Sequence, residues 1–213
     1  MVVSALEGHR IWASQYDGSL NPLLALEERV LGTLKGRTCV DVGCGTGRWT
    51  SRLAGFGVDL CEEMLREGSE KSALRGRLLQ ADAGALPFAS GSSDLTLCSF
   101  AVGYMNNLPA AIAEIARITR PGGRVIITDL HPAAVAAGWT RSFRVGAAVY
   151  EMEHTRTAVP QTVEAARRCG LELAQQQDAC FGEPERPIFE AARKSLEDVA
   201  QTPAVWIGIW TKP

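Results

Sequence analysis

The stretch that decides the fold reads Cys39-Val40-Asp41-Val42-Gly43-Cys44-Gly45-Thr46-Gly47, and the next residues read Arg48-Trp49-Thr50-Ser51-Arg52-Leu53. Its first four residues are typical of a buried strand, and the residues after the last glycine begin a helix. The glycines between them can adopt positive φ angles and leave no Cβ in the way of a ligand. A helix N-terminus adds free backbone N–H groups and the positive end of its dipole. The segment therefore predicts a strand, a ligand-binding loop and a helix in direct succession.

The spacing of the glycines separates two kinds of cofactor loop. A dinucleotide-binding loop reads G-x-G-x-x-G, whereas this one reads G-x-G-x-G and follows Asp41 on the strand. The spacing disfavours a nicotinamide-dependent oxidoreductase. Taken alone, the glycines could also form nothing more than a tight turn.

Outward from this loop, short strand-like runs alternate with helix-like runs. The segment Leu108–Ile118 has apolar residues on one helical face, and the apolar run Val125–Ile127 suits a strand that is covered on both sides. This alternation predicts an α/β fold: a doubly wound, mostly parallel, seven-stranded sheet with helices on both faces. The predicted strands are Thr38–Val42, Phe56–Leu60, Leu78–Ala81, Asp94–Phe100, Gly123–Leu130, Leu171–Cys180 and Val205–Thr211.

The chain reads as one domain over residues 1–213, since no linker or repeat interrupts it. We expect an N-terminal helical lid (1–37), a cofactor-binding core (38–130), a lid or insertion after the fifth strand (131–159) and a C-terminal part of the sheet (160–213). Further helices are predicted from Asn21-Pro22 onward, over Pro160–Cys169 and over Ile188–Val199.

Composition and charge argue against several classes of protein. The chain has 46% hydrophobic and 22% charged residues, a net charge of −2 and no run of Lys and Arg, so no nucleic acid partner is expected. It has no signal-peptide pattern and no apolar run near the ~20 residues that span a bilayer, so no membrane partner is expected. Scattered cysteines without a CxxC pair predict reduced thiols and a cytoplasmic protein. No metal-ligand set is apparent, and the oligomeric state is left open.

The segment Asp41–Gly47 resembles the first motif of the class I, Rossmann-like S-adenosylmethionine-dependent methyltransferases of the small-molecule type. Further motifs of that family follow in the same order. They are Gly57-Val58-Asp59-Leu60, Glu62-Glu63-Met64-Leu65, Gln80-Ala81-Asp82-Ala83, Leu86-Pro87-Phe88, Ser93-Asp94-Leu95 and Arg120-Pro121-Gly122-Gly123-Arg124. The resemblance covers Thr38 to about Leu130. The stretch between Gly47 and Asp59 is short for the family, so we expect a trimmed first helix.

The resemblance implies S-adenosylmethionine as cofactor and assigns residues to it. Asp59 would accept hydrogen bonds from both ribose hydroxyl groups. Asp82 would accept a hydrogen bond from the adenine amino group, with the Ala83 amide contributing, and Asp41 would support the loop. The full predicted cofactor set is Tyr16, Asp41, Gly43, Cys44, Gly45, Gly47, Asp59, Leu60, Met64, Asp82, Ala83 and Phe100.

The acceptor should lie at the carboxyl ends of the strands, where open α/β sheets bind ligands. We expect methylation of a small molecule, at oxygen before nitrogen or carbon, by in-line displacement at the sulfonium methyl. His131 and His154 are candidate acid/base residues, although His131 could instead cap its strand, and His9 is expected on an exposed turn. Trp12, Tyr16, Trp139, Phe143 and Tyr150 could line an apolar pocket or belong to the core. The alternative function is a non-catalytic S-adenosylmethionine-binding scaffold or sensor.

Overall fold

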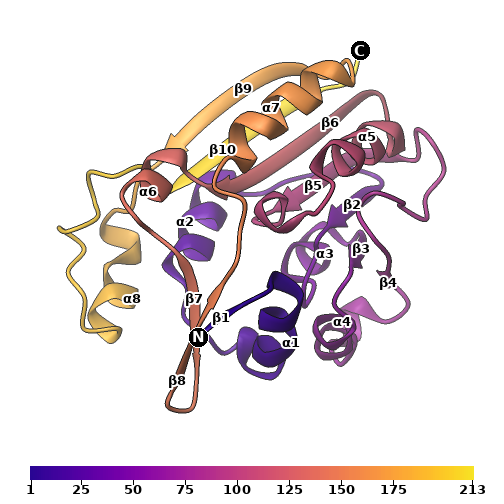
Figure 1. Ribbon diagram of the computed structural model, residues 1–213. Helices are drawn as coiled ribbons and strands as arrows, with labels where there is room; N and C mark the ends of the chain where they lie inside the picture. The colour runs from indigo at the N-terminus through magenta and orange to yellow at the C-terminus, as the bar shows by residue number, and fades with distance from the viewer.

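A seven-stranded sheet forms the centre of the computed structural model, which describes residues 1–213 (Figure 1). Its strand order is β4-β3-β2-β5-β6-β10-β9. The strands are β2 (Cys39–Val42), β3 (Phe56–Asp59), β4 (Leu78–Gln80), β5 (Ser93–Ser99), β6 (Thr119–Leu130), β9 (Glu172–Ala179) and β10 (Val205–Thr211). All seven predicted strands are present, although β6 begins at Thr119, where it pairs with Ser93, rather than at Gly123.

The sheet is mostly parallel, as predicted. Strands β2 to β6 pair in parallel, and β10 runs antiparallel to both of its neighbours, β6 and β9. Asp41 on β2 pairs with Gly57 of β3 on one side and with Leu97 of β5 on the other. The chain therefore leaves β2 for one half of the sheet and later crosses to the other half, and such a reversal opens a crevice at the carboxyl ends of the strands.

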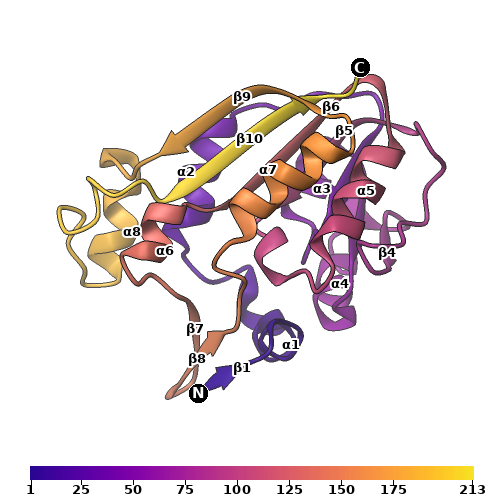
Figure 2. The ribbon, with the colours of Figure 1, turned by 45° about the horizontal axis from the view of Figure 1, so that its top comes forward.

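Helices cover both faces of this sheet (Figure 2). They are α1 (Ala5–Tyr16), α2 (Pro22–Leu31), α3 (Arg48–Leu53), α4 (Glu62–Ser69), α5 (Leu108–Ile118), α6 (Pro132–Ala136), α7 (Ala158–Arg168) and α8 (Arg186–Ala191), with short 3-10 turns at Ser72–Leu74, Val102–Tyr104 and Glu183–Glu185. Helices α5 and α7 pack on one face against Trp206 and Trp210, whereas Leu26 of α2 and Trp49 of α3 belong to the core of the other face. Helix α3 is short, as expected from the spacing between Gly47 and Asp59.

The N-terminus and the insertion after β6 form one lid. Strand β1 (Val2–Val3) pairs in parallel with β8 (Ala148–Met152), which pairs antiparallel with β7 (Arg141–Val145). Trp12 of α1 stacks on Phe143 of β7 with ring centroids 4.9 Å apart. Figure 1 shows α1 and this hairpin together below the sheet. The division at residues 37, 130 and 159 stays a prediction, but the two predicted lids share one small sheet, which sequence reasoning missed.

The helix predicted over Ile188–Val199 is wrong at its C-terminal end, because α8 stops at Ala191. Arg193 has a φ of 54°, and its N–H donates to the carbonyl of Glu190 while the N–H of Lys194 donates to that of Phe189. This pair of hydrogen bonds is a Schellman motif, which satisfies the last carbonyls of the helix and turns the chain away.

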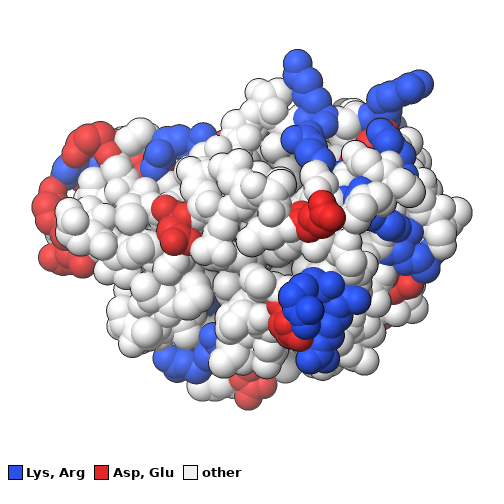
Figure 3. Space-filling view, turned by 90° about the horizontal axis from the view of Figure 1, so that it is seen from above, with Lys and Arg blue, Asp and Glu red and all other residues white.

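Positive and negative charges are mixed on the surface of the protein (Figure 3). On the face in Figure 3, Lys and Arg form separate groups beside Asp and Glu, with no continuous basic band. None of the helices has the length and apolar character needed to cross a membrane. All six cysteines are free thiols.

Candidate active site

A cavity of about 1050 Å³ lies between the carboxyl ends of the strands and the lid. Its floor includes Val42, Asp59 and Ser99, which stand at the ends of β2, β3 and β5. Its walls include Trp12 of the lid and Phe189 of α8. The cavity therefore opens at the edge of the sheet where the topology predicts a ligand.

The glycine loop is held against β3 by its own backbone. The N–H groups of Gly43 and Cys44 both donate to the Val58 carbonyl, at 2.8 and 3.0 Å, and the N–H of Gly45 donates to Oδ2 of Asp59 at 2.7 Å. Gly43, Gly45 and Gly47 have φ angles of 72°, 56° and 81°, which L side chains rarely adopt. A Cβ placed on Gly45 would meet no atom within 4 Å, so the loop presents open space there.

Two acids reach the cavity from neighbouring strands. Asp59 ends β3, and its Oδ1 accepts the N–H of Cys61 at 2.8 Å. Asp82 follows β4, and its Oδ1 accepts the N–H of Gly84 at 2.7 Å. Leu60 and Ala83 line the cavity beside them, and Leu60 is 45% exposed. Each carboxylate oxygen can accept two hydrogen bonds, so both acids keep free lone pairs.

Asp41 lies beneath the loop rather than in the cavity. Its carboxylate is buried, and Oδ2 accepts both the N–H and the hydroxyl of Thr50 in the first turn of α3. Oδ1 has no hydrogen-bond partner. Burial raises the pKa of Asp41 to about 6, although the Thr50 hydrogen bonds oppose the shift. An unsatisfied, buried carboxylate is costly and is found most often near functional sites.

Besides Asp41, four residues of the predicted cofactor set lie outside the cavity lining. Cys44 and Gly47 pack below the loop, where Gly47 caps α3, and Gly45 stands at the open turn. Met64 is only 1% exposed and packs with Ala13 of the lid helix. The structure therefore places Met64 in the core, because α1 lies over α4 and covers it.

Phe100 and Tyr16, two residues of the predicted cofactor set, line the cavity. Phe100 has a φ of 52°, and its N–H donates to the Thr128 carbonyl at 3.0 Å. A bulky residue in this region is strained, and such strain gathers at functional sites. The Tyr16 hydroxyl makes no hydrogen bond, and burial raises the pKa of Tyr16 to about 12, so the phenol stays protonated. Of the predicted aromatic set, only Tyr150 is absent from the cavity lining; it stacks on Phe143 in the lid.

The structure does not bring the two predicted catalytic histidines into this cavity. His131 is the N-cap of α6: its Nδ1 accepts the N–H of Ala133 at 3.0 Å, and Nε2 lies 3.2 Å from Asp178. His154 is half-buried, its Nε2 atom is buried without a hydrogen-bond partner, and burial lowers the pKa of its ring. Both residues follow β6 in the chain, but α6 and the hairpin turn them away from the ends of the strands.

His9 is the histidine that lines the cavity, so the expectation of an exposed turn is wrong. Its Nδ1 lies 2.8 Å from the Ala5 carbonyl and its ring packs edge-on against Tyr104, with centroids 5.1 Å apart. Burial lowers the pKa of His9, with Arg141 acting in the same direction and Asp59 opposing. Helical spacing puts His9 on one face with Trp12 and Tyr16, a signal that the sequence already held.

Sequence reasoning also missed Arg141, which ties the lid to the strand ends. Its guanidinium pairs with the buried carboxylate of Asp129 at the end of β6 and donates to the Phe100 carbonyl at 2.9 Å. The same group lies over the Tyr104 ring, 4.6 Å from its centroid. The Arg141 guanidinium thus contacts the ends of β5 and β6 and also Tyr104, which lines the cavity.

Comparison with known proteins gives a family match for the core. Residues 40–127 match a family model described as a methyltransferase domain. The chain is 37% identical over 108 residues to a malonyl-[acyl-carrier protein] O-methyltransferase of Erwinia pyrifoliae, a match covering 47% of this chain and 41% of that protein. It is 31% identical over 143 residues to a demethylmenaquinone methyltransferase of Staphylococcus aureus, covering 57% and 59%. The chain thus spans about two to three fifths of the length of these relatives.

The fold comparison covers almost the whole chain. The crystal structure of an S-adenosylmethionine-dependent methyltransferase from Mesorhizobium loti matches with a TM-score of 0.64 and 21% identity, over 98% of this chain and 100% of the other. The matched core carries the glycine loop, and the matched fold includes the lid that closes the cavity over it. Residues 40–127 therefore match a methyltransferase domain, and the chain as a whole has the fold of S-adenosylmethionine-dependent methyltransferases.

Proposed function

We propose that this protein transfers a methyl group from S-adenosylmethionine to an oxygen atom of a small-molecule acceptor. The observation that carries this proposal is one cavity that joins two environments. At one end are Gly43 of the glycine loop and the acids Asp59 and Asp82; at the other are the aromatic side chains of the lid with His9 among them. Apolar walls with a few placed polar groups are typical of small-molecule sites.

The residues at the first end fit the cofactor of the family. Open space lies in front of Gly45, and Asp59 and Asp82 keep acceptor capacity toward the cavity. Leu60 offers an exposed apolar surface beside them. When bound there, S-adenosylmethionine supplies a methyl group whose bond to a positively charged sulfur breaks, and the electron pair stays on the sulfur.

His9 is the proposed base for the acceptor. A carbonyl oxygen only accepts hydrogen bonds, so the contact with Ala5 requires the proton of the neutral ring on Nδ1. Nε2 then carries the free lone pair, makes no hydrogen bond to the protein and can take the proton of an acceptor O–H group. A lowered pKa keeps the His9 ring neutral near pH 7, which is the form that a base needs.

Two further residues hold this base in place. Tyr104 holds the His9 ring by an edge-on contact, and the guanidinium of Arg141 lies over the Tyr104 ring. Since a methyl group bound to a positively charged sulfur already leaves readily, the protein mainly has to align the acceptor and remove one proton. Methylation at oxygen is also supported by the name of the Erwinia relative, an O-methyltransferase. The six free cysteines support a cytoplasmic location.

Two measurements on the purified protein test the proposal. Titration calorimetry with S-adenosylhomocysteine is expected to show binding, which Asp59→Ala weakens. Incubation with methyl-labelled S-adenosylmethionine and pools of small phenols, carboxylic acids and alcohols is expected to give labelled product and S-adenosylhomocysteine. Binding without turnover on any pool would favour the scaffold or sensor function, and the absence of binding would refute both.

A further inference from the structure

Five charged residues line the cavity: two acids, one paired arginine and two further cations. Asp59 and Asp82 stand at the strand ends, and Arg141 is neutralised by Asp129. The remaining two are the cations Arg144 and Lys194, and neither forms an ion pair or a side-chain hydrogen bond within the protein. The end of the cavity away from the glycine loop therefore carries two uncompensated positive charges.

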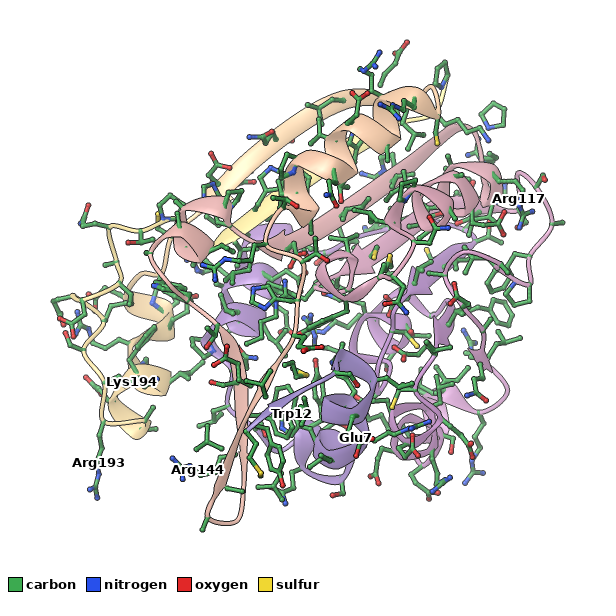
Figure 4. The ribbon with its side chains drawn as sticks, in the orientation of Figure 1. Glu7, Trp12, Arg117, Arg144, Arg193 and Lys194 are labelled. Carbon is green, nitrogen blue, oxygen red and sulfur yellow. The ribbon has the colours of Figure 1, made fainter.

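These two cations come from separate parts of the chain. Arg144 lies on β7 directly after the buried Phe143, and Lys194 follows α8 as the last residue of its Schellman motif. Figure 4 shows Arg144 on the hairpin and Lys194 at the end of α8, on opposite sides of the gap between these elements. The motif turns the chain at Arg193, whose side chain extends into solvent in Figure 4, and the next residue, Lys194, lines the cavity.

Aromatic and aliphatic side chains separate these cations from the strand ends. On the lid side they are Trp12 and Phe143, and on the α8 side Phe189 and Ile188. Figures 1 and 2 show α8 and α4 at opposite ends of the molecule, so the cations lie far from the acids that face the cofactor. The cavity thus runs from an acidic end, past apolar walls, to a cationic mouth.

This inference rests on the proposed function and specifies the chemical class of the methyl acceptor. We propose that the acceptor is an amphipathic anion: a ring-bearing apolar body lies between the lid and α8, and a carboxylate, sulfonate or phosphate group lies between Arg144 and Lys194. Exposed cations attract an anion modestly one at a time, but two that converge on one group also fix its orientation. His9 then meets the opposite end of the same molecule, where the reacting oxygen lies.

A pair of fluorescent probes that differ in one charged group tests this subsite. Anilinonaphthalene sulfonate has an aromatic body and one anionic group, and phenylnaphthylamine has the same kind of body without the charge. Both are titrated into the protein saturated with S-adenosylhomocysteine. The double variant Arg144→Gln/Lys194→Gln is expected to bind the sulfonate about tenfold more weakly and the uncharged probe unchanged.

A matched control removes the same charge elsewhere. Lys35 and Arg75 are exposed, form no ion pair and lie outside the cavity. The variant Lys35→Gln/Arg75→Gln is expected to bind both probes as the wild type does. Raised salt should weaken sulfonate binding to the wild type and leave the Arg144/Lys194 variant little changed.

Three results with the fluorescent probes would overturn the proposed subsite. They are unchanged sulfonate affinity in the Arg144/Lys194 variant, equal loss for both probes, and equal loss in the control variant. Weaker S-adenosylhomocysteine binding in the Arg144/Lys194 variant would also overturn it, because the cations would then serve the cofactor. Failure of the proposed function is distinct, since it would appear in the wild type as no cofactor binding or no turnover.

Discussion

The N–H of Gly45 donates a hydrogen bond of 2.7 Å to Oδ2 of Asp59, so the glycine loop after β2 is fastened to the end of β3. The other oxygen of Asp59 accepts the N–H of Cys61, at the start of α4. One carboxylate therefore shapes the loop and also offers its remaining lone pairs to the cavity. Loss of this charge should affect the binding of the cofactor more than the stability of the core.

The first prediction concerns Asp59→Asn. The amide keeps the size of the side chain but replaces one acceptor oxygen with an NH2 donor. Either the hydrogen bond from the Gly45 N–H is lost, or the cavity loses an acceptor for the cofactor. A hydrogen bond to a charged group is worth about 1.5–3 kcal/mol, so affinity for S-adenosylhomocysteine should fall tenfold or more by calorimetry. Glu62→Gln, which removes an exposed carboxylate three residues away, is the control and should bind normally. Unchanged affinity in Asp59→Asn would remove it from the proposed site.

The second prediction compares two glycines, Gly45 and Gly76, that both have positive φ angles. Gly45 and Gly76 have φ angles of 56° and 69°, and a Cβ on either meets no atom within 4 Å. Gly45→Ala and Gly76→Ala should therefore each lose about 1 kcal/mol of stability in urea unfolding. Only Gly45→Ala should also lose affinity for S-adenosylhomocysteine, because its Cβ enters the space in front of the loop. Equal affinities in the two variants would mean that the loop is only a turn.

The third prediction concerns His9→Gln and uses an acceptor found in the turnover screen. Turnover should fall by about 10²–10⁴-fold, the range for loss of a general base, while affinity for S-adenosylhomocysteine changes little. Burial lowers the pKa of His9, so the wild-type rate should decline only at a pH below 6.5, the ordinary pKa of histidine. The variant should lack this acid limb.

The control for His9 is His131→Gln. Its imidazole caps α6 away from the cavity, so the variant should lose about 1 kcal/mol of stability and keep its turnover and pH profile. A pH profile in His9→Gln that still shows the wild-type acid limb would exclude His9 as the base.

The fourth prediction uses the raised pKa of Asp41. An acid whose pKa is about 6 in the folded state and about 3.9 when unfolded destabilises the fold wherever it must be ionised, above pH 6. Asp41→Asn should therefore raise the free energy of unfolding at pH 7.5 by about 1–3 kcal/mol. The gain should shrink as the pH falls from 6 and vanish below about pH 4. Urea unfolding at pH 7.5 and pH 4 measures this difference, and a gain that is equal at both would contradict the prediction.

The amino-acid sequence by itself determined the sheet, the glycine loop and the helix faces. Helix α5 spans Leu108–Ile118, the residues that carry the apolar periodicity, and Val125–Ile127 is fully buried in β6 as its continuous apolar run indicates. The positions of Asp59 at the end of its strand and of Asp82 shortly after its strand were likewise readable. These features depend on spacing along a few consecutive residues, because period and turn chemistry are local properties.

The tertiary structure alone decided which side chains meet at the reacting end of the cavity. His9 and Arg141 are more than a hundred residues apart in the chain, yet both contact Tyr104. They meet because β1 pairs with β8 and carries α1 over the strand ends. His131, in contrast, sits next to β6 in the sequence but is turned outward as the cap of α6. Contacts made by folding a lid onto a sheet depend on long-range packing, and no local pattern of residues specifies them.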